Sequence, residues 1–283
     1  MSFRLATLHG RATLLGARGV YDLATRADPA LADPMEALRR HDELHAVSAR
    51  LEDSAPDGPL DPAALDPCVP RPQKIFAIGL NYRSHAQESG MDLPEVPLVF
   101  TKFRNCLNGP AGDIVVFGPT TDWEAELVVV LGRRGRDIAA AHAWDHVAGL
   151  TCGQDVSERA TQFAAKPPHF DLGKSFDTFG PIGPAVVSRD ALPNPDDLAI
   201  RCAVNGDVMQ DARTSDLIFG VPALIAYLSG VCTLEPGDLI FTGTPAGVGA
   251  GRGRFLKPGD VITTTIEGLG TLTNRCVARE PAR

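Results

Sequence analysis

Two glutamates lie one residue apart in the segment DWEAEL, residues 122–127, just before the apolar run VVVLG. Side chains alternate between faces along a β-strand, so Glu124 and Glu126 would point the same way. Val128 and Val130 continue that face, which places the pair where the strand enters the core. Two carboxylates about 4 Å apart repel by about 4 kcal/mol at an effective dielectric of about 20. If they are buried, they must be protonated, paired or bound to a metal ion. The alternative is a solvated strand face.

A third carboxylate, Asp155, follows the apolar run VAGLTC and precedes a helix expected over residues 156–165. Arg159 and Gln162 stand four and seven residues after it, on one face of that helix. A set of carboxylates without Cys or His favours a hard divalent cation, which means Mg²⁺ or Mn²⁺, with Ca²⁺ as a substitute. We therefore expect the two glutamates and Asp155 to hold such an ion, which would neutralise the carboxylate pair.

A histidine and a glutamate three residues apart in SHAQE, His85 and Glu88, fit one helical turn. Glu88 would orient the imidazole, and His85 would act as the base that activates a water molecule. Gly90, Pro94 and Pro97 follow, as suits a segment that closes over a substrate. The alternative is a surface histidine.

Two other histidine pairs are spaced four residues apart, His41/His45 and His142/His146. They could bind Zn²⁺ in principle, but neither has a third ligand or the H-E-x-x-H form, so we expect solvated helix faces. The Gly-rich segment TGTPAGVG at 242–249 lacks G-K-[ST] and is not a phosphate-binding loop.

The composition excludes several classes of partner. The formal net charge of the 283 residues is −8, which argues against nucleic acid or an anionic membrane, because phosphate binding needs clustered Lys and Arg. No apolar run approaches the roughly 20 residues of a membrane span, and the N-terminal MSFRLATLHG lacks the apolar region of a secretory signal. Six scattered cysteines without a C-x-x-C pair indicate reduced thiols in a cytoplasmic protein.

The elements that must position these residues are mostly strands. Runs rich in β-branched and aromatic residues, two of them after a Pro-Gly turn, predict strands at KIFAIGL, PLVFTKF, IVVFG, AELVVVLG, AIRCAVNG, DLIFTG, DVITTTIEG and GTLTNRC. Helices are expected over 138–148, 156–165 and 214–231. The pattern predicts a mostly β protein with some α, a β-sandwich or barrel-like roll and not a doubly wound sheet.

A boundary is expected where SAPDGPLDPAALDPCVPRPQ places six prolines in twenty residues, which is typical of a linker. We therefore expect a small N-terminal α+β domain over residues 1–54, with short strands and a helix at 34–51. A Pro-rich linker would occupy 55–73, and a catalytic domain 74–283.

The sequence resembles the fumarylacetoacetate hydrolase family in four segments, which follow one another in the order EAEL, QDVSERATQ, LGKSFDTFGP and FTGTPAGVG. Asp155, in the second segment, stands 29 residues after Glu126. IGLNYRSHAQE is similar to the segment that opens the catalytic domain of that family. The resemblance runs from about Lys74 to Cys276. It implies a mixed β-sandwich roll, Mg²⁺ or Mn²⁺ held by carboxylates, a small 2-oxo or β-diketo acid as substrate, and a homodimer.

The resemblance also implies roles for further residues. Lys174, in GKSF, would be the catalytic cation that lets an anionic substrate approach, with Arg159 as a second. Thr242 and Thr244 would bind the carboxylate of the substrate, and Tyr82 and Gln162 would contact the substrate as well.

The reaction expected first is hydrolysis of a carbon–carbon bond in an acylpyruvate or fumarylpyruvate, through an enolate that the metal stabilises as a Lewis acid. The alternatives are a 2-hydroxyhepta-2,4-diene-1,7-dioate isomerase or an oxaloacetate decarboxylase, in aromatic-compound catabolism. A more distant alternative is a metal-stabilised β-protein without chemistry of its own.

Overall fold

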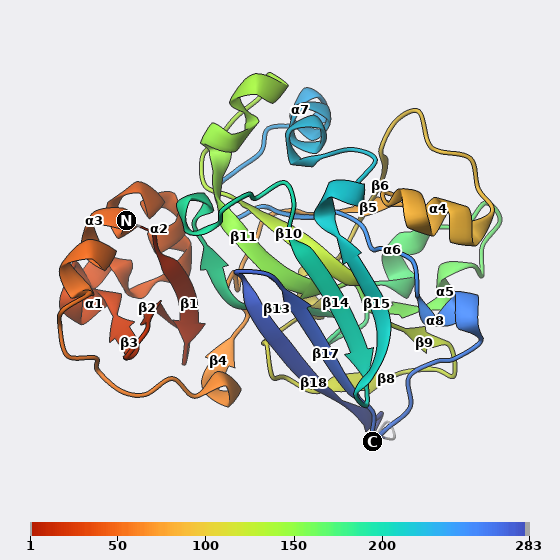
Figure 1. The fold of residues 1–283 in the computed structure, drawn as a ribbon, viewed down its shortest axis with the longest axis horizontal. Helices are drawn as coiled ribbons and strands as arrows, with labels where there is room; N and C mark the ends of the chain where they lie inside the picture. The colour runs from red at the N-terminus through yellow and green to blue at the C-terminus, as the bar shows by residue number, and fades with distance from the viewer. Residues whose placement is uncertain (1, 281–283) are drawn as a thin grey trace.

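Two stacked sheets form the body of the protein in a computed structural model that describes residues 2–280. The larger sheet (Figure 1) has the order β3 (Gly19–Asp22), β2 (Arg11–Gly16), β1 (Arg4–Leu8), β13 (Gly180–Val187), β11 (Val147–Gln154), β10 (Ala125–Leu131), β16 (Leu239–Phe241), β5 (Ile75–Gly79) and β6 (Leu98–Thr101). Two short strands extend it, since β4 (Leu65–Asp66) pairs with β1, and β7 (Leu107–Asn108) pairs with β13.

The smaller sheet has the order β15 (Asp207–Arg213), β14 (Ala199–Val204), β17 (Val261–Ile266), β18 (Gly270–Ala278) and β8 (Ile114–Val116). It packs against the larger sheet through contacts of β14, β17 and β18 with β10, β11 and β13. One apolar cluster fills the space between the sheets and includes Leu127 and Val129 from β10 with Ile200, Ile262 and Leu272. The predicted sandwich roll with some helix is therefore confirmed.

Strand β10 shows the alternation that its sequence predicts. Leu127 and Val129 point into the core between the sheets, while Val128 and Val130 join a second apolar cluster on the opposite face. Every residue of β10 is buried. A strand covered on both faces is apolar at every position, which explains the run LVVVL.

The N-terminal segment continues the larger sheet. Strand β1 pairs antiparallel with β13, with Leu5 opposite Val186, and β4 lies within the expected linker yet pairs with β1. Phe3 and Leu38 of this segment share one apolar cluster with Val130 of β10. The domain boundaries stay a prediction, but the sheet and the core run across the expected linker (left in Figure 1).

The expected strands are confirmed, whereas several expected helices are shorter or broken. The helix expected over 34–51 is divided at Arg40 into α2 (Pro34–Arg39) and α3 (His41–Leu51). The helix expected over 138–148 was wrong in type, because Ala140–His146 forms the 3-10 helix η4 and β11 starts at Val147. The helix expected over 214–231 begins only at α7 (Val221–Val231), since Pro222 occupies its first turn.

The helix expected over 156–165 is reduced to α5 (Arg159–Gln162), because β12 (Ser157–Glu158) pairs with β9 (Thr121–Asp122). Strands β13 and β15 were not predicted from the sequence. The remaining short elements are α1 (Leu23–Arg26), α4 (Arg83–Ser89), α6 (Phe170–Gly173), α8 (Gly249–Arg252), and the 3-10 helices η1 (Pro29–Ala32), η2 (Pro62–Ala64), η3 (Arg104–Cys106), η5 (Arg189–Ala191) and η6 (Thr214–Asp216).

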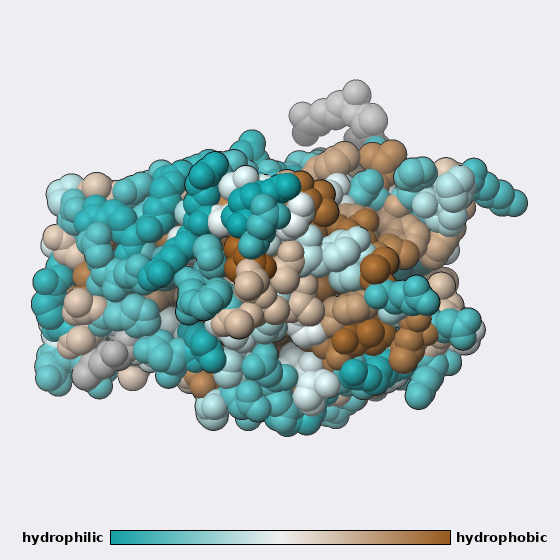
Figure 2. Space-filling view, turned by 90° about the horizontal axis from the view of Figure 1, so that it is seen from above, coloured by the Kyte–Doolittle hydropathy of each residue, from teal (hydrophilic) through white to brown (hydrophobic). Residues whose placement is uncertain are grey.

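Four of the short helices lie around one end of the larger sheet. In Figure 1, α4, α5, α6 and α8 gather on the right, beyond β5 and β6. Figure 2 looks onto α7 from above and shows polar side chains over the N-terminal segment and hydrophobic ones towards the middle and right. Among residues 2–280, no helix is long and apolar enough to cross a membrane.

Candidate metal centre

Three buried carboxylates converge at the ends of two paired strands. One ligand oxygen each from Glu124, Glu126 and Asp155 lies within 4.8 Å of the others. Because β10 and β11 pair antiparallel with Ala125 opposite Gln154, the residues just outside the pair, Glu124 and Asp155, are neighbours. The Asp155 N–H donates to the Glu124 carbonyl at 2.9 Å. Strand pairing therefore brings together carboxylates that are 29 and 31 residues apart in the chain.

Two predicted cations contact this cluster. The Lys174 Nζ lies 2.7 Å from Glu124 Oε2, 2.7 Å from Asp155 Oδ2 and 2.8 Å from the Ser157 hydroxyl. The Arg159 guanidinium lies 2.7 Å from Glu124 Oε1 and 2.8 Å from Asp122. Both oxygens of Glu124 are thus paired with a cation.

A third cation, Lys102, was missed from the sequence. Its fully buried Nζ lies 2.7 Å from Asp155 Oδ1 and also donates to the carbonyls of Phe179 and Lys174. Lys102 comes directly after strand β6, within the largely apolar segment PLVFTKF. A lysine in such a segment is a signal of a buried ion pair. Nothing in its spacing indicated Asp155 as the partner, because the two residues are 53 positions apart.

The carboxylates differ in their proton affinity. Burial raises the pKa of Glu124, but Lys174 and Arg159 outweigh it and hold that pKa at about 2. Burial, followed by Asp155 and Glu124, raises the pKa of Glu126 well above its usual value. Glu126 accepts one hydrogen bond, from the Gly243 N–H at 2.7 Å. Three buried carboxylates that converge in this way are a donor set that fits a hard divalent cation.

The predicted histidine–glutamate pair lies on α4. The His85 Nδ1 is 3.0 Å from Glu88 Oε2, and both side chains are partly exposed. Glu88 Oε1 accepts a hydrogen bond from the Gly247 N–H at 2.9 Å. His85 is near enough to Glu124 to help lower the pKa of that carboxylate. The role of this pair stays a prediction.

Thr242 and Thr244 lie beside the cluster, but their hydroxyl protons are used within the protein. The Thr242 hydroxyl donates to the Leu127 carbonyl at 2.9 Å, and the Thr244 hydroxyl donates to the Ala125 carbonyl at 2.8 Å. Both threonines therefore hold the segment after β16 against β10. The predicted contact with a substrate carboxylate is not tested by this arrangement.

Two further predicted substrate contacts are buried close to the cluster. The Tyr82 hydroxyl is fully buried and has no hydrogen-bond partner among the described residues. Burial, then Glu126 and Asp216, raises the pKa of Tyr82 and keeps the phenol protonated. The Gln162 Oε1 accepts from Arg159 Nη1 at 2.9 Å. An unpaired buried hydroxyl is a donor left for a ligand.

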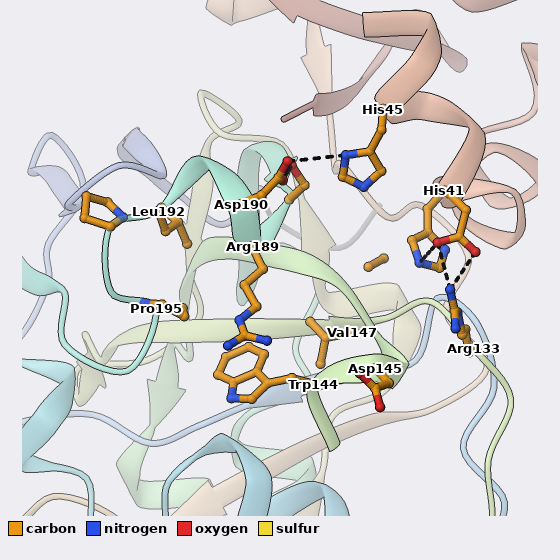
Figure 3. Close-up of a pocket in the computed structure, with 14 residues that line it drawn as sticks. His41, His45, Arg133, Trp144, Asp145, Val147, Arg189, Asp190, Leu192 and Pro195 are labelled. Atoms are coloured by element: carbon orange, nitrogen blue, oxygen red, sulfur yellow. Dashed lines mark hydrogen bonds and ion pairs between the residues drawn. The ribbon is translucent and has the colours of Figure 1, made fainter. Parts of the chain in front are cut away.

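A cavity of about 560 Å³ lies away from this cluster, where α3 meets the catalytic part of the chain. Figure 3 shows His41 and His45 on one side of it and the Arg189 guanidinium over the Trp144 ring, 5.0 Å from the ring centroid. His45 Nδ1 lies 3.5 Å from Asp190, and His41 Nδ1 lies 3.1 Å from the Leu38 carbonyl. His45 thus contacts the rest of the protein, whereas His41 bonds within the N-terminal segment and is buried, so the solvated face expected for this residue was wrong.

Comparisons with known proteins agree with this geometry. Residues 74–277 match the family model described as fumarylacetoacetate (FAA) hydrolase C-terminal. The mitochondrial oxaloacetate tautomerase FAHD2A of Bos taurus is 40% identical over 265 residues, which cover 92% of this chain and 84% of the relative. Two solved structures are similar as well. A candidate HpcE protein from Mycobacterium smegmatis is 45% identical with a TM-score of 0.91, covering 98% of this chain and 100% of that one.

The second is maleylpyruvate hydrolase from Sphingobium sp. SYK-6 in complex with manganese(II) and pyruvate. It is 30% identical with a TM-score of 0.82, covering 98% of this chain and 100% of that chain. The similar proteins thus include a tautomerase and a hydrolase.

Proposed function

This chain belongs to the fumarylacetoacetate hydrolase family, and we propose that it is a divalent-metal-dependent enzyme that acts on small 2-oxo acids. The observation that supports the proposal is the convergence of Glu124, Glu126 and Asp155, with the His85–Glu88 pair near enough to act electrostatically on Glu124. A structural ion site would need neither this pair nor a buried, unpartnered tyrosine hydroxyl. These features argue against a β-protein that binds a metal only for stability.

Charge supports an anionic substrate. When ionised, the four buried carboxylates Asp122, Glu124, Glu126 and Asp155 outnumber the three cations Lys102, Lys174 and Arg159 by one. A bound divalent ion would change this excess of one negative charge into one positive charge. The site would then attract a carboxylate.

Mg²⁺ or Mn²⁺ fits the donor set best, because all three ligands are hard carboxylate oxygens, and Ca²⁺ would be a substitute. The manganese in the Sphingobium hydrolase supports this choice. Such an ion would act as a Lewis acid on the oxygens of a 2-oxo acid.

The side chains of this chain would move the protons. His85 is partly exposed and held by Glu88 through Nδ1, so its Nε2 is the atom that would take a proton from a substrate carbon or from water. The Tyr82 hydroxyl would donate to a substrate oxygen, which would satisfy its unpaired proton. Lys174 and Arg159 would hold Glu124 and, with Gln162, the carboxylate of the substrate.

Proton transfer next to the 2-oxo group is the reaction that we propose first, as tautomerisation or isomerisation of a small 2-oxo diacid. The Bos taurus tautomerase, 40% identical over 92% of this chain, supports this reaction more than the less similar hydrolase does. Hydrolysis of a carbon–carbon bond, expected first from the sequence, becomes the second candidate. The His85–Glu88 pair favours it, because a base at this place could also activate water. Decarboxylation of oxaloacetate would form an enolate as well, by loss of carbon dioxide and not of a proton.

A substrate panel tests the proposal. The protein, loaded with Mn²⁺ or Mg²⁺, is given oxaloacetate, an acylpyruvate and a 2-hydroxydienoate, while enol absorbance and products are followed. Faster enol–keto exchange of oxaloacetate without cleavage is the expected result. Cleavage of the acylpyruvate would establish the second candidate. Metal binding without turnover of any of the three compounds would contradict the proposal.

Two properties outside the site belong to this proposal. We propose a homodimer, since apolar Leu98, Phe103, Phe163 and Leu172 are exposed on β6, α5, α6 and the adjoining loop. We also propose a cytoplasmic setting, because all six cysteines are free thiols.

A further inference from the structure

Asp122 is a buried carboxylate outside the metal-ligand set, and it contacts two segments that are distant in the sequence as well as its chain neighbour. Its side chain accepts hydrogen bonds from the N–H groups of Trp123 at 2.8 Å, Gly249 at 2.6 Å and Ala250 at 2.9 Å. It also pairs with Arg159 at 2.8 Å. A carboxylate with no exposed surface is tolerated only when its oxygens are satisfied in this way.

On one side, Asp122 is connected to a metal-ligand candidate through Arg159. The same Nη2 of Arg159 lies 2.8 Å from Asp122 Oδ2 and 2.7 Å from Glu124 Oε1. The planar guanidinium binds both carboxylates in a fixed geometry. The orientation of Arg159 against Glu124 therefore depends on Asp122.

On the other side, Asp122 fixes the loop that receives α4. The Gly249 and Ala250 N–H groups bind Asp122, and two residues earlier the Gly247 N–H binds Glu88. This loop has no room to shift. A Cβ on Gly247, whose φ is +104°, would lie 2.0 Å from the Met209 carbonyl, and one on Gly249 would lie 2.5 Å from Asp122 Oδ1.

Helix α4 is attached at both ends. Near its start, Arg83 donates to the Leu217 carbonyl at 2.9 Å, and the Ser84 N–H donates to Asp216 at 3.1 Å. Near its end, Glu88 binds both Gly247 and His85. The position of His85 thus depends, through Glu88, on the segment that Asp122 holds.

We propose that Asp122 is a positioning residue that couples the carboxylate cluster to the segment 83–97, which we call the lid segment. Through Arg159 it orients Glu124, and through Gly249 and Ala250 it holds the Gly247 N–H that donates to Glu88, so that His85 and the metal ligands are placed by one side chain. The inference rests on the proposed function only where it names His85 as the proton carrier.

Asp122→Asn tests the coupling, since the amide keeps the shape of the side chain and loses its charge. Three quantities are measured in Mn²⁺-loaded protein: Mn²⁺ affinity by calorimetry, backbone hydrogen exchange of residues 83–97, and kcat and KM with the best 2-oxo acid of the panel. We expect Mn²⁺ affinity within about threefold of wild type, because the three ligands are unchanged. Exchange in the lid segment should become at least tenfold faster, and kcat should fall more than KM changes.

Asp42→Asn is the matched control, because it breaks an aspartate–arginine pair of 2.7 Å with Arg133 at the surface, and neither residue contacts the lid segment or the residues that hold it. It should leave exchange in the lid segment unchanged. Glu88→Ala breaks the connection at its other end, because it removes the acceptor of the Gly247 N–H, and the double variant with Asp122→Asn should exchange no faster than Glu88→Ala alone.

Unchanged exchange over 83–97 in Asp122→Asn would overturn the proposal, even if kcat fell. If Asp122→Asn does not fold, Asp122→Glu replaces it, since the longer side chain keeps the charge but cannot keep the same hydrogen bonds to Gly249 and Ala250. Unchanged lid exchange would then overturn the proposal as well. Hydrogen exchange needs no turnover. A wild-type protein inactive on every 2-oxo acid would therefore contradict the proposed function and leave this test valid.

Discussion

Lys102 and Lys174 bind the two oxygens of one buried carboxylate. The Lys102 Nζ lies 2.7 Å from Asp155 Oδ1, and the Lys174 Nζ lies 2.7 Å from Asp155 Oδ2. Burial lowers the pKa of Lys102, but Asp155 more than compensates and raises that pKa above its usual value. Lys102 stays charged in this buried position because the carboxylate is present. Cations and carboxylates at this site therefore depend on one another.

Replacing Lys102 by Met should destabilise the fold. The change leaves Asp155 buried with one of its two cations, and removal of one partner of a buried ion pair costs about 3–5 kcal/mol of unfolding free energy. Urea denaturation measures the loss. Lys257→Met removes a lysine at the surface and should change the unfolding free energy little. Equal values for the two variants would show that Lys102 is not part of the charge balance.

Replacing Glu126 by Gln should abolish binding of Mn²⁺ or Mg²⁺ and all turnover. The amide can still accept the hydrogen bond from Gly243, so the fold is kept, but a carboxylate ligand is lost. Glu95→Gln, on the exposed part of the lid segment, is the control. Isothermal calorimetry gives the affinity. An unchanged affinity in Glu126→Gln would remove this residue from the metal site.

Replacing His85 by Ala should lower the rate of the favoured reaction by about 10²–10⁴-fold, the usual effect of losing a general base. Metal affinity should persist, since His85 is not among the three carboxylate ligands. Glu88→Gln should show a weaker form of the same effect, because it misorients the imidazole without removing it. Steady-state kinetics and calorimetry on the same samples check both expectations. A His85→Ala enzyme with wild-type kcat would refute the assigned role.

The stability of the protein should fall as the pH drops below about 6.5, the usual pKa of histidine, partly because of His41. Burial is the main cause that lowers the pKa of His41 in the folded protein. The unfolded chain therefore takes up a proton before the folded protein does, and acid favours unfolding. One such group contributes at most about 1.4 kcal/mol per pH unit. Unfolding midpoints between pH 8 and 5 should be less pH-dependent in His41→Gln, and an identical slope would contradict this account.

Light scattering at micromolar concentration should show a dimer. If the exposed apolar residues on β6, α5 and α6 form the contact, Leu172→Glu should shift the mass towards the monomer, because it places a charge in an apolar contact. Leu60→Glu changes an exposed leucine near the N-terminal segment and should not alter the mass. A wild-type monomer would contradict the proposed assembly.

Local patterns in the sequence determined the strands and the first half of the site. The period of two along DWEAELVVVL placed Glu124 and Glu126 on one face, and it assigned Val128 and Val130 to the same face. His85 and Glu88 are within one helical turn, so their contact also follows from spacing. Such features depend on residues a few positions apart, where the backbone itself fixes the geometry.

Only the tertiary structure brought Lys102 to Asp155, Asp122 to Gly249 and β1 to β13. These partners are 53, 127 and more than 170 residues apart, and the sequence around each of them is compatible with other partners. The tertiary structure also determined the lengths of helices. Residues of the helix expected over 156–165 form strand β12 instead, because β12 pairs with β9. Strand pairing and the burial of charge are properties of the whole chain, because the free energy of each contact depends on what else is excluded from water.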